Sequence, residues 1–121
     1  MDHVPEAHFL QMDILDMIFG KESFDGIFEA GVFFHFTKGE QDTILVNIFA
    51  FLKPEGIYLS LYPVGNSEGM QQMQISDEIY HRYTRFLPLE EWIQEVMDHG
   101  FSKYRILDFS LARFRAILFY K

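Results

Sequence analysis

The chain has 121 residues and a formal net charge of −8, with 49% apolar and 17% aromatic residues. This length allows one domain at most, and the acidic balance disfavours both nucleic acid and an anionic membrane surface, because each is bound through a basic face. The sequence contains no cysteine, which excludes disulfides and thiolate zinc sites.

The N-terminus has neither the basic patch nor the apolar segment of a signal peptide. The longest apolar stretch, Ile44 to Leu52, is interrupted by Asn47 and is too short to span a bilayer. We therefore expect a soluble, cytoplasmic protein.

The predicted elements alternate between strand and helix. The first strand covers residues 8–12 and ends at Asp13, and the second covers residues 24–28. A helix is predicted over residues 41–52, because its apolar residues lie on more than one side, as in a helix packed on a sheet. This helix ends before Pro54, which cannot continue it.

The second half begins with a predicted strand over residues 57–61. Residues 64–87 are polar and show the least periodicity, and within them residues 72–81 are a candidate helix. Pro88 and the acids that follow it predict a helix over residues 89–99. The last two strands are predicted over residues 101–109 and 114–120. This order indicates an α/β fold with an antiparallel strand pair at the C-terminus.

Four segments in this order resemble the C-terminal part of class I S-adenosylmethionine-dependent methyltransferases. "FLQMDILDM" resembles the third strand of that family, and "ESFDGIFEAGVFFHF" resembles its fourth strand and the loop that follows. "FLKPEGIYLSL" resembles the turn into the fifth strand, with Glu55 in place of the first glycine of the family turn. "RYTRFLPLEEWIQEVMDHGF" resembles the helix before the sixth strand, with His99 in place of the usual alanine.

The resemblance implies an incomplete Rossmann-like sheet over residues 1–121, mostly parallel, with helices on its faces. The acidic and glycine-rich first motif of the family is missing, so we expect a single, N-terminally truncated methyltransferase domain. The family strand order resembles 3-2-1-4-5-7-6, which would leave the strand at residues 24–28 as an exposed edge. Such an edge invites pairing with another chain, either in a homodimer or with the missing N-terminal half.

The resemblance also implies S-adenosylmethionine as cofactor and assigns residues to it. Asp13 resembles the carboxylate that binds the adenine amino group, and Ile14 resembles the residue whose backbone amide meets the ring. Glu29, Ala30 and Phe34 would lie at the carboxyl end of a strand, where parallel sheets bind ligands. The alternatives are that Asp13 is a turn or helix-capping residue, that residues 29–31 are only a loop, and that the aromatic residues are core.

A small-molecule methyl acceptor is expected from the same resemblance, bound by Tyr80, Arg82 and Tyr83. An arginine can hold a carboxylate through two parallel hydrogen bonds. Equally, Tyr83 and Phe86 can be packing residues, and the arginines of this segment can pair with local acids.

No catalytic residue is assigned. His35 is a candidate base because an imidazole ordinarily titrates near neutrality, but a methyl sulfonium is already activated, so positioning outweighs base catalysis. The five histidines show no metal-ligand spacing, and no metal site is expected.

Three functions are compatible with these features. The first is methyl transfer by a protein of which this chain is one part, the chain alone being inactive. The second is a non-catalytic remnant or interaction module that dimerises through the sheet edge. The third, a part of a dehydrogenase, requires an acid at the end of a strand that follows a glycine-rich turn, which the sequence lacks.

Overall fold

The computed structural model describes residues 21–31 and 33–121. The predicted strand at residues 8–12, together with Asp13 and Ile14, lies outside the described residues. The elements in chain order are β1 (Phe24–Ala30), the 3₁₀ helix η2 (Phe33–His35), α1 (Lys38–Phe51), β2 (Leu52–Pro63), β3 (Ser67–Ile75), β4 (Glu78–Phe86), α2 (Leu89–Met97), β5 (Lys103–Leu111) and β6 (Phe114–Tyr120).

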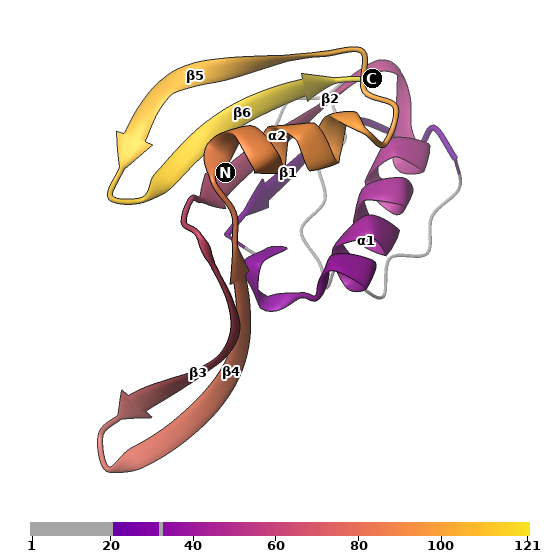
Figure 1. Ribbon diagram of the computed structural model, residues 1–121. Helices are drawn as coiled ribbons and strands as arrows, with labels where there is room; N and C mark the ends of the chain where they lie inside the picture. Colours follow the sequence, from indigo (N-terminus) through magenta and orange to yellow (C-terminus); the bar gives the residue numbers. More distant parts are fainter. Residues whose placement is uncertain (1–20, 32) are drawn as a thin grey trace.

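Four of the described strands form one mixed sheet in the order β1-β2-β6-β5 (Figure 1). β1 and β2 are parallel, whereas β6 is antiparallel to both of its neighbours. Three of these four strands therefore run in the same direction, and β5 and β6 form the predicted antiparallel pair. This is the 4-5-7-6 part of the expected strand order, and the α/β fold class is confirmed.

α1 begins three residues earlier than predicted because Thr37 and Glu40 cap its N-terminus reciprocally. The Glu40 backbone N–H donates to the Thr37 hydroxyl at 3.3 Å, and the Thr37 N–H donates to the Glu40 carboxylate at 3.0 Å. The helix ends at Phe51, before Pro54 as predicted, but β2 begins at Leu52, so Pro54 lies within this strand, which starts five residues earlier than predicted. Glu55 lies where the pairing of β2 with β1 is irregular, and it has φ 66°, a left-handed conformation that glycine adopts more readily.

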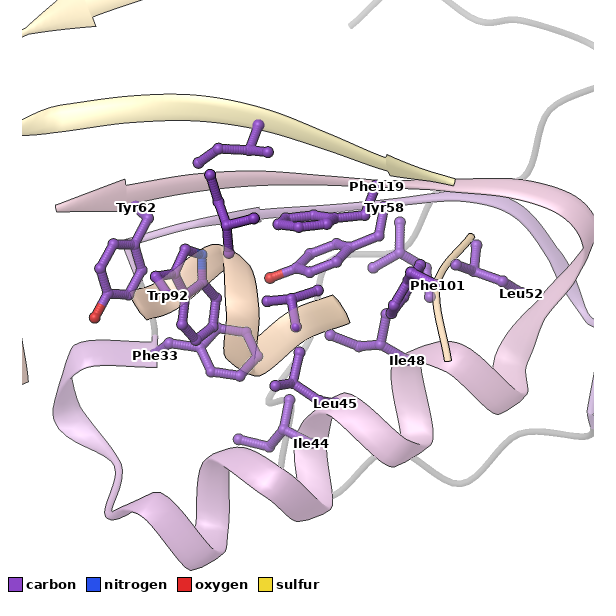
Figure 2. Packing of buried hydrophobic residues seen from close by; sticks show 14 of the residues in the cluster. Phe33, Ile44, Leu45, Ile48, Leu52, Tyr58, Tyr62, Trp92, Phe101 and Phe119 are labelled. Atoms are coloured by element: carbon purple, nitrogen blue, oxygen red, sulfur yellow. The ribbon is translucent and has the colours of Figure 1, made fainter. Parts of the chain in front are cut away.

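Both described helices pack on the same face of the four-stranded sheet (Figure 2). β2 directs Tyr58, Ser60 and Tyr62 to that face, and all three are buried. Trp92 of α2 stacks on Tyr62 with ring centroids 4.3 Å apart. The core around these rings consists of apolar residues from α1, α2, β6 and η2, among them Ile44, Leu45, Ile48, Val96, Phe119 and Phe33.

Residues 67–86 form a long two-stranded hairpin, so the candidate helix at residues 72–81 is wrong. β3 pairs with β4 from Ser67–Phe86 at the base to Ile75–Glu78 at the tip. In Figure 1 this hairpin projects away from the sheet and its helices. Ser76, with φ 56°, and Asp77 connect the strands without the glycine that usually marks so short a loop.

Candidate functional site

The parallel strands β1 and β2 end at the same edge of the sheet. β1 ends at Ala30, and the Gly31 N–H still donates to the Leu61 carbonyl oxygen at 2.9 Å. The chain then enters η2 after β1 and the hairpin after β2. Ligands of parallel α/β sheets bind beyond the carboxyl ends of the strands, so this edge is the candidate functional site.

Gly31 makes the turn out of β1 possible. It has φ 65°, and a Cβ built on it would lie 3.2 Å from the Phe114 ring. Both the conformation and the close approach favour glycine at this position. Ala30 beside it is exposed, so it is a described part of this edge that a ligand can reach without moving the core.

Glu29 lies on the opposite side of the strand from Ala30 and is only 4% exposed. The Tyr58 hydroxyl donates to its carboxylate at 2.8 Å, and the Ser60 hydroxyl donates to the same oxygen at 3.1 Å. The Trp92 indole N–H in turn donates to Ser60 at 3.2 Å. The Glu29 carboxylate, near the end of β1, is thus part of a buried hydrogen-bond network.

This network has an electrostatic consequence for the buried tyrosines. Burial raises the pKa of Tyr58 well above its ordinary value, and the Glu29 carboxylate acts in the same direction. Burial also raises the pKa of Tyr62 to about 12. Both hydroxyls are therefore neutral hydrogen-bond partners at physiological pH.

Phe34 packs against the base of the hairpin. Its ring stacks on Phe86 with centroids 5.0 Å apart and lies 3.9 Å from the His35 ring. The guanidinium of Arg113 covers the Phe86 ring at 4.1 Å. η2 and β4 are therefore in direct contact at the carboxyl edge of the sheet.

Two buried polar atoms near this contact have no hydrogen-bond partner among the described residues: His35 Nδ1 and Thr84 Oγ1. Thr84 is 3% exposed. Burial and the nearby charge of Arg82 lower the pKa of His35, whereas a backbone hydrogen bond with Tyr83 acts in the opposite direction. A buried polar group without a hydrogen-bond partner is rare, and a polar group of a ligand is one partner that can satisfy it.

The three predicted acceptor residues do not lie on one face of the hairpin. Strand alternation places Tyr80 and Arg82 on the same face as Thr84 and Phe86, which continues toward η2. We call these four residues the acceptor face. Tyr83 lies on the opposite face, where its hydroxyl donates to the Glu68 carboxylate at 2.6 Å.

Arg85 belongs to the segment that the resemblance predicts to face the acceptor, and it lies at the base of the hairpin. Its guanidinium is 8% exposed and donates to Glu95 of α2 at 2.6 Å and to Gln41 of α1 at 2.6 Å. Glu68 accepts from it at 3.3 Å. The alternative that an arginine of this segment pairs with local acids is thus correct for Arg85, which joins the hairpin to both helices.

Within residues 21–31 and 33–121, no group of three or more potential ligands is arranged to hold a metal ion. No helix of this part of the chain is long and apolar enough to cross a membrane. The cofactor roles of Glu29, Ala30 and Phe34 stay predictions. Ala30 fits a ligand at this edge, whereas Glu29 faces the core.

The family described as Methyltransferase domain matches residues 2–60 of the chain. A search of curated proteins gives no match.

Among solved structures, a Methanosarcina mazei SAM-dependent methyltransferase is similar, with a TM-score of 0.71 and 14% identity over 91% of this chain and 65% of that one. The 1,6-didemethyltoxoflavin-N1-methyltransferase of Burkholderia thailandensis, solved with 1,6-didemethyltoxoflavin and S-adenosylhomocysteine, has a TM-score of 0.66 and 17% identity. The match covers 93% of this chain and 50% of that one. The DhpI–SAH complex has a TM-score of 0.71 and 15% identity, over 93% of this chain and 53% of DhpI. The chain thus spans about half the length of two of these proteins.

Proposed function

Because the chain belongs to the class I S-adenosylmethionine-dependent methyltransferase family, we propose that it forms the C-terminal part of an enzyme that methylates a small molecule. The observation that carries the proposal is the carboxyl edge of β1 and β2, where exposed Ala30, Gly31 and the base of the hairpin meet. This is the edge at which parallel α/β sheets bind ligands.

In this proposal the adenine side of the cofactor lies against Asp13, Ile14, Ala30 and Phe34. S-adenosylmethionine, when bound, supplies the activated methyl group, so the protein has mainly to position the acceptor. Glu29 supports the site from the buried face of the sheet, because its carboxylate accepts hydrogen bonds from Tyr58 and Ser60 and thereby holds β2 against β1.

The acceptor lies on the acceptor face of the hairpin in this proposal. Arg82 and Tyr80 are exposed there, and an arginine beside an aromatic ring suits an acidic or planar molecule. Nearer the sheet, His35 Nδ1 and Thr84 Oγ1 have no hydrogen-bond partner in the described part of the chain and can bind polar groups of the acceptor. Because both atoms are buried, a small displacement of η2 from β4 must accompany acceptor binding.

We propose further that the single domain of residues 1–121 is inactive alone and takes up the remaining part of the enzyme along β1. β1 pairs with β2 on one side, and no strand of the described residues lies on its other side. Phe28 on this strand is 49% exposed. An apolar edge strand of this kind favours pairing with another segment, from a second copy or from the missing half.

An NMR titration of the chain with S-adenosylhomocysteine tests this function. We expect weak binding in the millimolar range, with shifts at Ala30, Gly31 and Phe34, because only part of the cofactor contacts belongs to this chain. Asp13→Ala should remove the shifts, whereas Asp108→Ala on exposed β5 should leave them unchanged. Micromolar binding would contradict the proposal that only part of the cofactor contacts belongs to this chain.

The alternative function, a non-catalytic interaction module, is favoured by one observation. Two of the predicted cofactor residues already have partners within the chain. Glu29 accepts a hydrogen bond from Tyr58, and Phe34 stacks on Phe86. Absence of any shift at millimolar S-adenosylhomocysteine in the folded chain would support this alternative.

A further inference from the structure

The hairpin projects from the rest of the described chain and exposes large apolar side chains. Met70 is 66%, Ile79 55% and Tyr80 44% exposed. Arg85 holds the hairpin at its base, whereas residues 76–82, which form the tip and the first part of β4, are all exposed. A two-stranded ribbon alone in water is only marginally stable, so further pairing would stabilise it considerably.

The outer edge of β3 lacks the protection that edge strands usually carry. Residues 69–75 of β3 contain no charged residue and no proline. The edge of β4 carries Glu78 and Arg82, and the edge strand β5 carries Lys103, Arg105 and Asp108. Because charges on an edge discourage pairing with another chain, the edge of β3 is better suited to pairing than the edges of β4 and β5.

We infer that two copies of this chain associate by antiparallel pairing of β3 with β3, which joins the two hairpins into one four-stranded sheet. A twofold axis perpendicular to the sheet brings residues of the same face opposite each other. We centre the register on Gln72, which then lies opposite the partner's Gln72. Residues 69–75 of one copy pair with residues 75–69 of the other.

A second copy fits this edge, because the strand can pair with itself without bringing like charges together. In this register Met70 lies opposite the partner's Gln74, and Gln71 lies opposite the partner's Met73. No like charges meet over the seven paired residues, because each copy contributes only uncharged side chains there. The pairing uses backbone groups at the edge and leaves both faces of each hairpin, including the acceptor face, accessible.

Light scattering after size exclusion tests the association. We expect a dimer at high micromolar concentration that Gln72→Lys converts to a monomer, because the two lysines would face each other across the twofold axis. His81→Lys is the matched control: His81 pairs with Gln72 within the hairpin, so it adds the same charge at the same height on the other strand. A monomer at every concentration, or a dimer that Gln72→Lys leaves intact, would overturn the inference.

Disulfide trapping tests the register. Because the chain contains no cysteine, a single introduced thiol can form only an intermolecular bond. We expect Gln72→Cys to cross-link rapidly under mild oxidation. In contrast, Met70→Cys should cross-link poorly, because the two copies of residue 70 are separated by four residue steps, about 13 Å. Equal cross-linking of both variants would contradict the proposed register. A dimer formed through β1 would be unaffected by Gln72→Lys and by His81→Lys, so these variants distinguish pairing through β3 from pairing through β1.

Discussion

The four-stranded sheet with its two helices and the projecting hairpin are held together in different ways. In the sheet and helices, aromatic and aliphatic side chains from α1, α2, β2 and β6 are fully buried around Trp92. In the hairpin, β4 is buried only at Thr84, Arg85 and Phe86, and the rest of the strand is partly or fully exposed. The sheet and helices therefore depend on apolar burial, whereas the hairpin depends on a few contacts at its base.

This difference separates the properties of the two regions. Loss of one base contact can loosen the hairpin while the sheet stays folded, because local opening costs least where few buried contacts resist it. The candidate site lies at the boundary, where η2 of one region meets β4 of the other. Movement of the hairpin therefore changes the site without changing the core.

Trp92→Ala should have the largest effect on stability. The side chain is fully buried, stacks on Tyr62 and donates to Ser60, so its loss leaves a cavity and removes one of the two hydrogen bonds of the Ser60 hydroxyl. We expect a decrease of about 3 to 5 kcal/mol in the free energy of unfolding. Urea denaturation followed by circular dichroism measures this change, and Glu91→Ala, exposed on the same helix, is the control. A decrease below about 1 kcal/mol would contradict the account of the core.

Arg85→Met should follow, at about 3 kcal/mol, because it leaves the half-buried Glu95 carboxylate without its partner. Arg82→Met, on the same strand but exposed, should have little effect. Hydrogen exchange should show that amides of β3 and β4 lose more protection than those of β2. The double variant Arg85→Met/Glu95→Leu should recover part of the loss, because the Glu95 carboxylate is removed together with its partner, and Glu68, the other acid that pairs with Arg85, is exposed. Equal loss of protection in β2 would show that the hairpin and the sheet unfold together.

The contrast between the two regions also explains how far the sequence predicts the fold. The elements of the sheet and both helices follow from apolar periodicity and from breakers such as Pro54 and Gly100, with shifts of a few residues at their ends. The strand order, however, was expected from the family resemblance alone, because strand pairing depends on contacts between distant segments. Thr37 and Glu40 carry the sequence signature of a capping box, which would have placed the start of α1 correctly.

The hairpin could not be predicted in this way. Its residues alternate poorly because both faces are exposed near the tip, and Ser76–Asp77 lacks the glycine of typical short hairpin loops. The partners of Arg85 come from two helices that flank the hairpin in the sequence, so no local pattern reveals them. The burial of Glu29 likewise depends on Tyr58 and Ser60, about thirty residues away in the sequence.

A smaller effect is expected at the start of α1. Thr37→Ala removes the hydroxyl that accepts the Glu40 N–H and should lower the free energy of unfolding by about 1 kcal/mol. Thr43→Ala is the matched control, because its hydroxyl donates only to the carbonyl oxygen of Gly39 within the helix. Denaturation midpoints of the two variants measure the difference. Equal midpoints would show that the cap contributes little and that tertiary packing alone fixes the start of the helix.

The smallest effect is a pH dependence at the boundary between the two regions. Burial and Arg82 lower the pKa of folded His35 below its ordinary value of 6.5, so the unfolded state binds more protons near that pH. The contribution of neutral His35 to stability is therefore present above pH 6.5 and is lost as the pH falls below it. Unfolding midpoints between pH 5 and 7.5 should decline less steeply toward acid in His35→Asn than in the parent chain. His81→Asn, exposed on β4, should keep the parent slope. If both variants keep that slope, the imidazole is solvated in the folded chain, and the contact between η2 and β4 is open rather than closed.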